Sequence, residues 1–172
     1  FNTIDTDEKA YWLGFLAADG AVVGSSLSLS LALKDSEHVQ RWQQALRATH
    51  PVKTYVYPEK RLAFCRLAIS SKPLVASVRP YGIVQAKTWT IRFPMLPPQW
   101  RGAFVRGYFD GDGSVYRTFI KTGPTTGYFR YGVSISGNHA FLSTMRSHLP
   151  GHWFLVKDKR IWALKACDKR TL

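Results

Sequence analysis

Long apolar runs and paired cysteines are absent from this sequence. No apolar run reaches the roughly 18 residues that a membrane-spanning helix needs, so neither a membrane span nor a membrane partner is expected. Nothing at the start has the pattern of a signal peptide. Cys65 and Cys167 lie far apart without metal-ligand spacing, so we predict free thiols on strands. These absences favour an intracellular protein in a reducing compartment.

Acidic residues are also scarce. The 172 residues include 24 Lys and Arg but only 11 Asp and Glu, which gives a net charge of +13. Between residues 51 and 92 the single acid is Glu59. Such a surface attracts polyanions, because it neutralises phosphates and releases counterions. A solubility charge or a membrane-surface patch is the alternative, but no basic amphipathic helix marks the membrane case. Together with 14% aromatic residues, the charge favours a nucleic-acid partner.

The chain repeats itself. Residues 10–22 (AYWLGFLAADGAV) resemble residues 103–115 (AFVRGYFDGDGSV), and the alignment pairs glycine with glycine and aspartate with aspartate at a constant offset. Further on, residues 28–46 match residues 131–149 with a slightly larger offset. Each half is therefore expected to contain a helix, strands, a second helix and more strands in the same order.

Local patterns place the elements of each half. Alternating apolar residues predict strands over residues 26–34 and 130–136, each with one buried face. Asp35 and Asn138 are predicted N-caps of the helices that follow, the first running to about Ala48. The remaining predictions are hairpins over 51–70 and 152–167, a short helix over 72–81 that Gly82 ends, and a loop over 122–127.

Small residues lie on one face of each repeated helix. Gly14 and Ala18 are four positions apart, as are Gly107 and Gly111, and residues at that spacing share a helix face. Small side chains allow two helix backbones to approach closely. We therefore predict that the two repeated helices pack against each other around a pseudo-twofold axis, with these four residues at the helix interface.

That packing would bring Asp19 and Asp112 together at the ends of the two helices. Two carboxylates at two helix C-termini repel each other and the helix dipoles. A divalent cation removes the conflict, since carboxylates and backbone carbonyls are ligands of Mg²⁺, which also accepts phosphate oxygens. Mg²⁺ (or Mn²⁺) shared with a DNA phosphate is thus the expected cofactor, and it could assist phosphodiester hydrolysis.

Residues 12–20 (WLGFLAADG) and 105–113 (VRGYFDGDG) resemble the two copies of the LAGLIDADG motif in single-chain homing endonucleases. The likeness covers essentially the whole chain. It implies an α+β fold with two pseudo-symmetric α-β-β-α-β-β-α halves, whose antiparallel sheets form a DNA-binding saddle. The expected domains are an N-terminal half (1–92), a proline-rich linker (93–99) and a C-terminal half (100–172) that lacks its final helix. One chain with both motifs is expected to act as a monomer.

The resemblance also implies roles for individual residues. Asp19 and Asp112 take the metal-binding catalytic positions, and the carbonyls of Ala18 and Gly111 are further candidate ligands. Lys87 matches the catalytic basic residue, which could polarise water or steady phosphate charge; an ordinary phosphate-contacting or solvated lysine is the alternative. No second lysine of this kind follows in the C-terminal half.

Several polar residues near the motifs have more than one interpretation. Asp110 is acidic where the first copy has Ala17, so we read it as structural, paired with Arg106 at i and i+4. Asp35 and Asn138 lie near water-orienting positions of the family, although capping explains them equally well. The histidines show no zinc spacing and are expected at the surface.

DNA contacts are expected from outward-facing residues of the two sheets. Serine and arginine can read base edges, whereas lysine more often holds phosphates. The predicted outward residues are Ser26, Ser28, Ser30, Lys34, Lys53, Tyr55, Tyr57, Arg61, Arg66, Arg117, Arg130, Ser134, Ser136, Lys157 and Lys165.

The resemblance implies a site-specific endonuclease of double-stranded DNA, of the type that serves intron or intein homing. The alternative is a non-catalytic relative, such as an RNA-splicing maturase with intron RNA as partner, or a transcription regulator. Such relatives lose the motif acids, whereas this chain keeps both Asp19 and Asp112. We therefore favour DNA cleavage.

Overall fold

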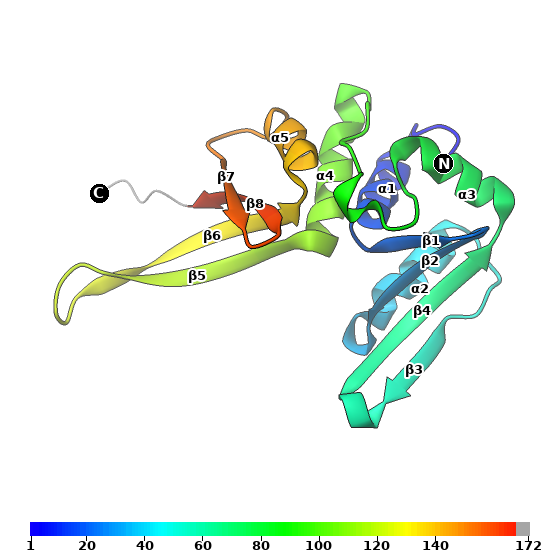
Figure 1. The fold of residues 1–172 in the computed structure, drawn as a ribbon, viewed down its shortest axis with the longest axis horizontal. Coiled ribbons are helices and arrows are strands. Elements are labelled where there is room, and N and C mark those ends of the chain that lie inside the picture. The colour runs from blue at the N-terminus through cyan, green and yellow to red at the C-terminus, as the bar shows by residue number, and fades with distance from the viewer. Residues whose placement is uncertain (168–172) are drawn as a thin grey trace. The chain divides into compact units, whose positions relative to one another are not determined.

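Helices alternate with antiparallel strands in the computed structural model, which describes residues 1–167 (Figure 1). The first part contains α1 (Asp7–Asp19), β1 (Gly20–Val23), β2 (Ser26–Ala32), α2 (Ser36–Ala45), β3 (Lys53–Tyr57), β4 (Leu62–Ser70), α3 (Lys72–Val78) and α4 (Pro98–Asp112). The second contains β5 (Gly113–Lys121), β6 (Gly127–Gly137), α5 (His139–Arg146), β7 (Phe154–Asp158) and β8 (Ile161–Cys167). The predicted α+β fold is confirmed.

The chain forms two compact units, Phe1–Gly111 and Asp112–Leu172. The first unit contains both repeated helices, because α4 belongs to it up to Gly111. This division differs from the boundaries at 92 and 100 that the repeat suggests. The expected lack of a final helix concerns the chain after Cys167, outside the described residues. Within residues 1–167, no helix is long and apolar enough to span a membrane.

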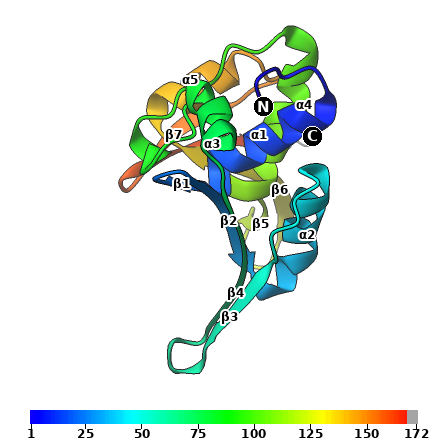
Figure 2. The ribbon, with the colours of Figure 1, turned by 90° about the vertical axis from the view of Figure 1, so that its right-hand side faces the viewer.

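The first sheet has the strand order β1-β2-β4-β3. One face of β2 carries Leu27 and Leu29, which are fully buried with Leu67 of β4. The helix α2 packs against β2 and β4 (Figure 2), and its residues Val39 and Trp42 are buried. The period-two pattern therefore identified the core face of β2 correctly.

The strand predicted over residues 26–34 is too long. β2 ends at Ala32, whose partner in β4 is Phe64, and Leu33–Asp35 forms a 3-10 turn into α2. Leu33 is consequently exposed, because the alternation stops where the chain leaves the sheet. Lys34 lies in this turn and not on a strand.

The predicted helix caps are partly confirmed. Asn138 caps α5, since its side-chain oxygen accepts a hydrogen bond of 2.9 Å from the Phe141 amide. Asp35 precedes α2 but makes no side-chain cap hydrogen bond, because the 3-10 turn already directs the chain into the helix. α2 ends at Ala45 instead of Ala48. The helix over residues 72–81 is α3 followed by a 3-10 turn, and Gly82 ends it with φ +81°.

The predicted packing of the repeated helices is confirmed. A Cβ added at Gly14 of α1 would lie 2.9 Å from the Tyr108 amide nitrogen of α4. A Cβ added at Gly107 would lie 2.9 Å from the Phe15 amide nitrogen of α1. Each glycine therefore faces the backbone of the opposite helix, and side chains at either position would force the helices apart.

The second sheet has the order β5-β6-β8-β7. Ile135 of β6 and Leu164 of β8 form a buried cross-strand pair beneath α5. The last pair between β6 and β8 joins Gly132 to Cys167, whereas the β5–β6 hairpin continues to Lys121 and Gly127 (Figure 1). Tyr131 is exposed for this reason, although the alternation predicted that it would be buried.

Two predicted outward residues lie on the wrong face of this sheet. Arg117 pairs with Tyr131, and Lys157 pairs with Trp162, so both share the face of Ile135. Directly paired residues point to the same side of a sheet, and a shift by one residue reverses the side. Arg130 lies on the opposite face from these two. The face prediction is therefore wrong for Arg117 and Lys157.

The β3–β4 and β7–β8 hairpin turns each contain a non-glycine residue with positive φ. Arg61 has φ +49° in the turn between β3 and β4, so it is a turn residue and not the strand residue expected. Lys159 has φ +52° between β7 and β8. Both cysteines are free thiols on strands, as predicted, with Cys65 buried and Cys167 exposed.

Candidate functional site

Asp19 is the last residue of α1 and is half-buried. A Cβ added at Gly111 would lie 2.9 Å from Oδ2 of Asp19. The carboxylate therefore lies directly against the backbone of the second motif, in a space that only glycine leaves open. Asp112 follows Gly111 as the last residue of α4. The sequence placed Asp19 correctly at the end of a helix that meets the other repeat.

Lys87 is buried with 8% of its surface exposed. Its Nζ donates a hydrogen bond of 3.0 Å to the carbonyl oxygen of Ala18 and another to the carbonyl oxygen of Gly20. These carbonyls flank Asp19, at the helix end where the dipole is negative. The ammonium thus satisfies backbone acceptors and offsets the negative charge of this helix end.

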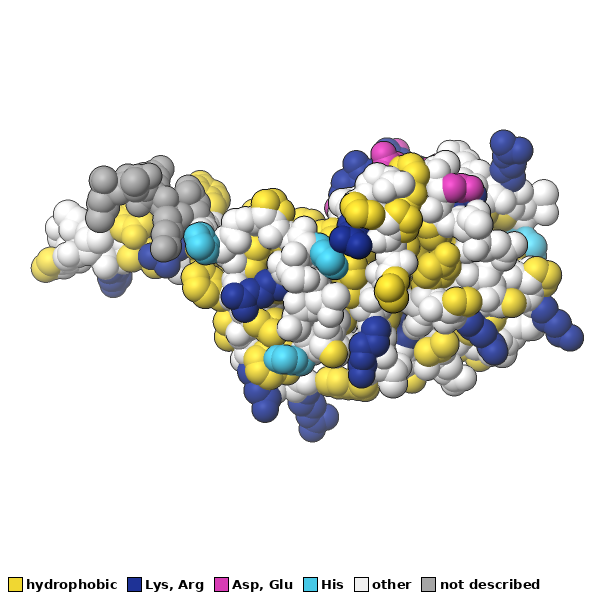
Figure 3. All heavy atoms as spheres, turned by 90° about the horizontal axis from the view of Figure 1, so that it is seen from above, with side chains coloured by type: hydrophobic (Ala, Val, Ile, Leu, Met, Phe, Trp, Pro, Cys, Tyr) yellow, Lys and Arg dark blue, Asp and Glu magenta, His cyan; other side chains and the backbone are white. Residues whose placement is uncertain are grey.

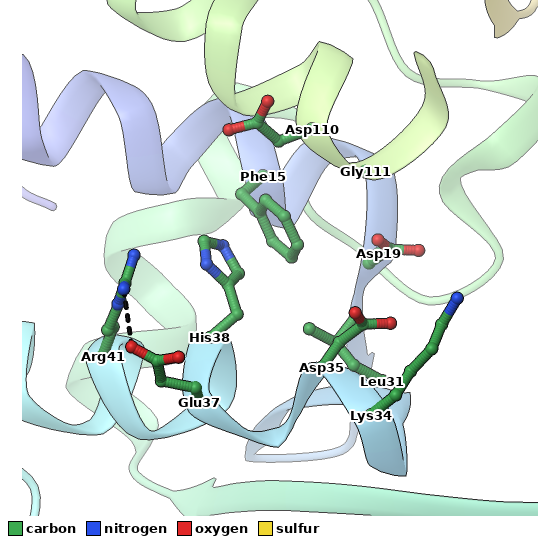
Figure 4. A pocket seen from close by; sticks show the side chains of 10 residues that line it. All are labelled: Phe15, Asp19, Leu31, Lys34, Asp35, Glu37, His38, Arg41, Asp110 and Gly111. Atoms are coloured by element: carbon green, nitrogen blue, oxygen red, sulfur yellow. Dashed lines mark hydrogen bonds and ion pairs between the residues drawn. The ribbon is translucent and has the colours of Figure 1, made fainter. Parts of the chain in front are cut away.

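A cavity of about 470 Å³ opens beside Asp19, entirely within the first unit (Figure 4). Asp19, Asp35 and Lys34 lie toward one end of it, and His38, Arg41 and Glu37 toward the other. Arg41 forms an ion pair of 2.6 Å with Glu37. The full lining is Phe15, Asp19, Leu31, Lys34, Asp35, Glu37, His38, Arg41, Asp110 and Gly111.

A hydrogen-bond network joins three helices at the edge of this cavity. The Tyr11 hydroxyl of α1 donates to Oδ2 of Asp110 in α4 at 2.8 Å, and it lies 3.2 Å from Nε2 of His38 in α2. Arg106 lies over the Tyr11 ring at 5.1 Å, and no ion pair joins it to Asp110 in the described structure. The predicted Arg106–Asp110 pair is therefore wrong, because Tyr11 takes the carboxylate instead.

His38 lies among aromatic rings. Its ring centroid is 4.4 Å from that of Phe15 and 5.0 Å from that of Trp12. Burial lowers the pKa of His38, and Arg41 lowers it further, while Asp110 and Asp35 oppose the shift. Burial also raises the pKa of Tyr11, and the neighbouring Asp110 carboxylate adds to that rise. His38 is thus a neutral, half-buried residue near pH 7 and not a free surface histidine.

The network of Tyr11, His38 and Asp110 was not predicted from the sequence, although the repeat contains a signal for it. The aligned counterparts of these residues are Phe104, Phe141 and Ala17, all of which are apolar and buried. Three positions are therefore polar in one half of the alignment and apolar in the other. Such a difference within a repeat marks side chains that the shared fold does not require.

Apart from Lys34 and Arg61, which lie in turns, the predicted outward residues of the first sheet share one face. Ser30 pairs with Arg66, and Arg66 pairs with Lys53, on the side opposite to the buried leucines. Ser28 is on that side but is buried, because Arg66 covers it and donates a hydrogen bond of 3.1 Å to its Oγ. The other members of this face are Ser26, Tyr55 and Tyr57.

On the face of the molecule seen in Figure 3, Lys and Arg side chains are common and Asp and Glu side chains are few. In the second unit, Arg130, Ser134, Ser136 and Lys165 share the face of the sheet that lies away from Ile135 and α5. A basic, partly aromatic sheet face of this kind can bind phosphates and base edges.

The donor set fits a divalent metal of the Mg²⁺ type. Among residues 1–167 no cluster of three or more His, Cys, Asp or Glu side chains could hold a metal. Mg²⁺ needs no such cluster, since it binds through one or two carboxylates plus waters and phosphate oxygens. Asp19 supplies one carboxylate against Gly111, and the Ala18 carbonyl keeps a second lone pair beyond its bond with Lys87.

No protein-family model and no curated protein matches the sequence. Solved structures match over 92% of the chain: the meganuclease I-SmaMI bound to uncleaveable DNA (12% identity, TM-score 0.64, 78% of that chain) and the LAGLIDADG meganuclease I-AabMI bound to uncleaved DNA (10%, 0.64, 78%). I-SmaMI bound to an uncleaved DNA target with calcium ions also matches (12%, TM-score 0.66, 79% of that chain). At this identity the likeness shows architecture, and we conclude that the chain has the single-chain LAGLIDADG fold.

Proposed function

We propose that this protein is a site-specific endonuclease that hydrolyses phosphodiester bonds of double-stranded DNA with Mg²⁺ or Mn²⁺. The observation that carries this proposal is the Asp19 carboxylate at the end of α1, packed against Gly111 of the second motif. A carboxylate at a helix C-terminus opposes the helix dipole, so its presence needs a cationic partner. The proposed partners are Lys87, which binds the carbonyls on either side of Asp19, and a divalent ion.

In this proposal Asp19 and Asp112 hold the metal, and the carbonyls of Ala18 and Gly111 are available as further ligands. When bound, the ion supplies Lewis-acid activation of a phosphodiester and of water. Lys87 fixes the backbone on both sides of Asp19 through its two carbonyl contacts, and so holds the direction of that carboxylate. Its positive charge also favours an approaching phosphate. A proposed water-orienting role for Asp35 is supported by its place in the same cavity as Asp19.

The two sheets supply the proposed DNA surface. Arg66 and Lys53 in the first unit, and Arg130 and Lys165 in the second, are cations on sheet faces away from the helices. The net charge of +13 supports phosphate binding. I-SmaMI, of the same fold, has been seen bound to uncleaved and to cleaved DNA. Because one chain carries both motifs, we propose that it acts as a monomer.

The test uses a randomised duplex library with Mg²⁺ or Mn²⁺, followed by sequencing of cut ends. The wild-type protein should cut a defined sequence, while Asp19→Asn and Asp112→Asn should bind the same duplex without cutting it. Asp158→Asn removes an exposed acid from the β7–β8 hairpin and is the matched control. Chelation of the metal should also stop cutting.

Two kinds of outcome would contradict the proposed metal-dependent endonuclease. Wild-type cutting by either motif variant, or undiminished cutting in a chelator, contradicts the proposed metal site. A wild-type protein that retains duplexes specifically but never cuts them would be the non-catalytic alternative, a nucleic-acid-binding relative. Retention of intron RNA in place of duplex DNA would favour the maturase form of that alternative.

A further inference from the structure

The second unit has a hollow of about 800 Å³ where β7 and β8 stop and the β5–β6 hairpin continues. Its lining includes Tyr116, Tyr128 and Arg130 of the hairpin. It also includes residues 150–153 and Phe154. The register places Tyr116, Tyr128 and Arg130 on the sheet face away from α5, the helix that this unit contains among its described residues. Its volume is in the range of sites for small organic ligands.

Aromatic rings dominate this lining. Tyr116 lies across the sheet: a Cβ added at Gly132 would lie 2.6 Å from its hydroxyl, which is 3.3 Å from Sγ of Cys167. Trp153 is fixed by a hydrogen bond of 2.9 Å from Nε1 to the Pro150 carbonyl. Phe154 is 56% exposed on the edge strand. The polar atoms of these rings are engaged within the protein, which leaves their faces as the available surface.

Within the described part of the chain, the charged side chains that line the hollow are basic. They are Arg130 and Lys165, and none of the lining residues among 1–167 is acidic. Arg130 donates a hydrogen bond of 3.5 Å to the Tyr128 hydroxyl, which holds its guanidinium beside a ring. A ligand that fits must therefore combine a flat, stackable body with negative charge.

We infer that this hollow binds an unpaired nucleobase together with its phosphate, as a site for single-stranded nucleic acid. Rings beside cations are how proteins bind single strands, since every base has a π-face and every linkage a phosphate. A base inside a duplex cannot enter, because both of its faces are already stacked. The inference rests on the proposed nucleic-acid function and extends it from paired to unpaired strands.

The test compares three fluorescent probes of about 12 nucleotides, a length within the usual range of single-strand sites. The probes are a thymidine strand, a uridine strand and a mixed-sequence duplex, each titrated with wild-type protein. Trp153→Ala should weaken binding of the single strands about 5- to 100-fold, which is the range for losing one stacked base. Duplex affinity should change less than about twofold.

Two further variants separate stacking from folding. Trp153→Phe keeps a ring and should restore most of the single-strand affinity, provided that stacking is the cause. Trp89→Ala removes a tryptophan that is 59% exposed in the first unit, and it should leave all three probes unaffected. The thymidine and uridine arms show whether the unpaired strand is DNA or RNA.

The outcomes also separate this inference from the nuclease proposal. Equal losses for single strands and duplex, or no loss for Trp153→Ala, would overturn the hollow as a single-strand site. Trp153-dependent single-strand binding by a protein that cuts no duplex would support the hollow and refute the nuclease. Metal-dependent duplex cutting without single-strand binding would support the nuclease and refute the hollow as a single-strand site.

Discussion

At the scale of single residues, Lys87 has the clearest expected effect on stability. Lys87→Met keeps the length and the apolar stem but removes the charged donor to two backbone carbonyls. Hydrogen bonds to charged groups contribute about 1.5–3 kcal/mol, so we expect a loss of that order in the free energy of unfolding. Urea unfolding of the two proteins measures it.

Lys34→Met is the control for that change, because Lys34 lines the same cavity but is exposed. It should leave the unfolding free energy within about 0.5 kcal/mol of wild type, as is usual for surface substitutions. Equal stability of Lys87→Met and wild type would show that the carbonyl contacts do not hold the end of α1.

His38 should make stability depend on pH. Burial lowers its pKa in the folded protein, so the unfolded chain binds a proton more readily. Stability attributable to His38 is therefore complete above its ordinary pKa of about 6.5 and is lost as the pH falls through the lower folded value. His38→Gln has no imidazole to titrate. Between pH 8 and pH 5 the wild type should therefore lose more unfolding free energy than the variant does. A constant difference in urea midpoints would contradict this.

A residue's environment can be predicted from the sequence when its own segment determines it, and not when residues of other helices do. Asp19 could be predicted because the motif places it at a helix end. The contact between Tyr11 and Asp110 could not, because it joins two helices and depends on their crossing. His38 joins them from a third helix. Its environment exists only once α1 and α2 have packed.

At the scale of elements, the helix crossing makes a matched pair of glycine substitutions possible. Gly107→Ala would place a methyl group against the backbone of Tyr11 and Phe15, so overpacking should cost about 1–3 kcal/mol or more. Gly102 is in the same helix, and a Cβ added there would have nothing within 4 Å, so Gly102→Ala should be neutral or stabilise by up to about 1 kcal/mol. Thermal unfolding compares them. Similar effects of both substitutions would mean that α1 and α4 do not cross at Gly107.

Strand faces were predictable only where one face is apolar. β2 alternates leucine with small residues, and its buried face follows directly. β5 has apolar residues on both faces, including Val115 and Tyr116, so its sequence cannot show which side Arg117 takes. β7 begins with three consecutive apolar residues and has the same ambiguity. In both cases the register of the hairpin decides the face.

At the scale of the whole molecule, the excess of positive charge predicts strong salt dependence of DNA binding. Each neutralised phosphate releases counterions, so affinity falls steeply as salt rises. For a surface with several phosphate contacts, we expect the affinity for duplex DNA to fall by about 10³-fold between roughly 50 and 200 mM salt. Fluorescence anisotropy at a series of salt concentrations gives the slope. A flat dependence would show that base contacts and not phosphates dominate.

The global architecture was the most predictable level. Two similar motifs at domain spacing indicated the repeat, and the repeat fixed the order of the elements. The fold is shared with I-SmaMI at 12% identity, so few residues are needed to specify it. The boundary between compact units was not predictable, because it depends on α4 joining the first unit across the helix crossing.

The crossing of α1 and α4 determines how a fragment of this chain should behave. The surface that α1 presents at Gly14 is shaped to receive a second glycine-bearing helix, and α4 fills it from a later part of the same chain. A fragment that stops before Pro98 lacks α4, so the face of α1 around Gly14 would be uncovered. The α1 helix of a second fragment also carries a glycine there and can pack against this face, so the isolated fragment should form a homodimer. Addition of the fragment that contains α4 should then dissociate the homodimer, because α4 competes for the same face.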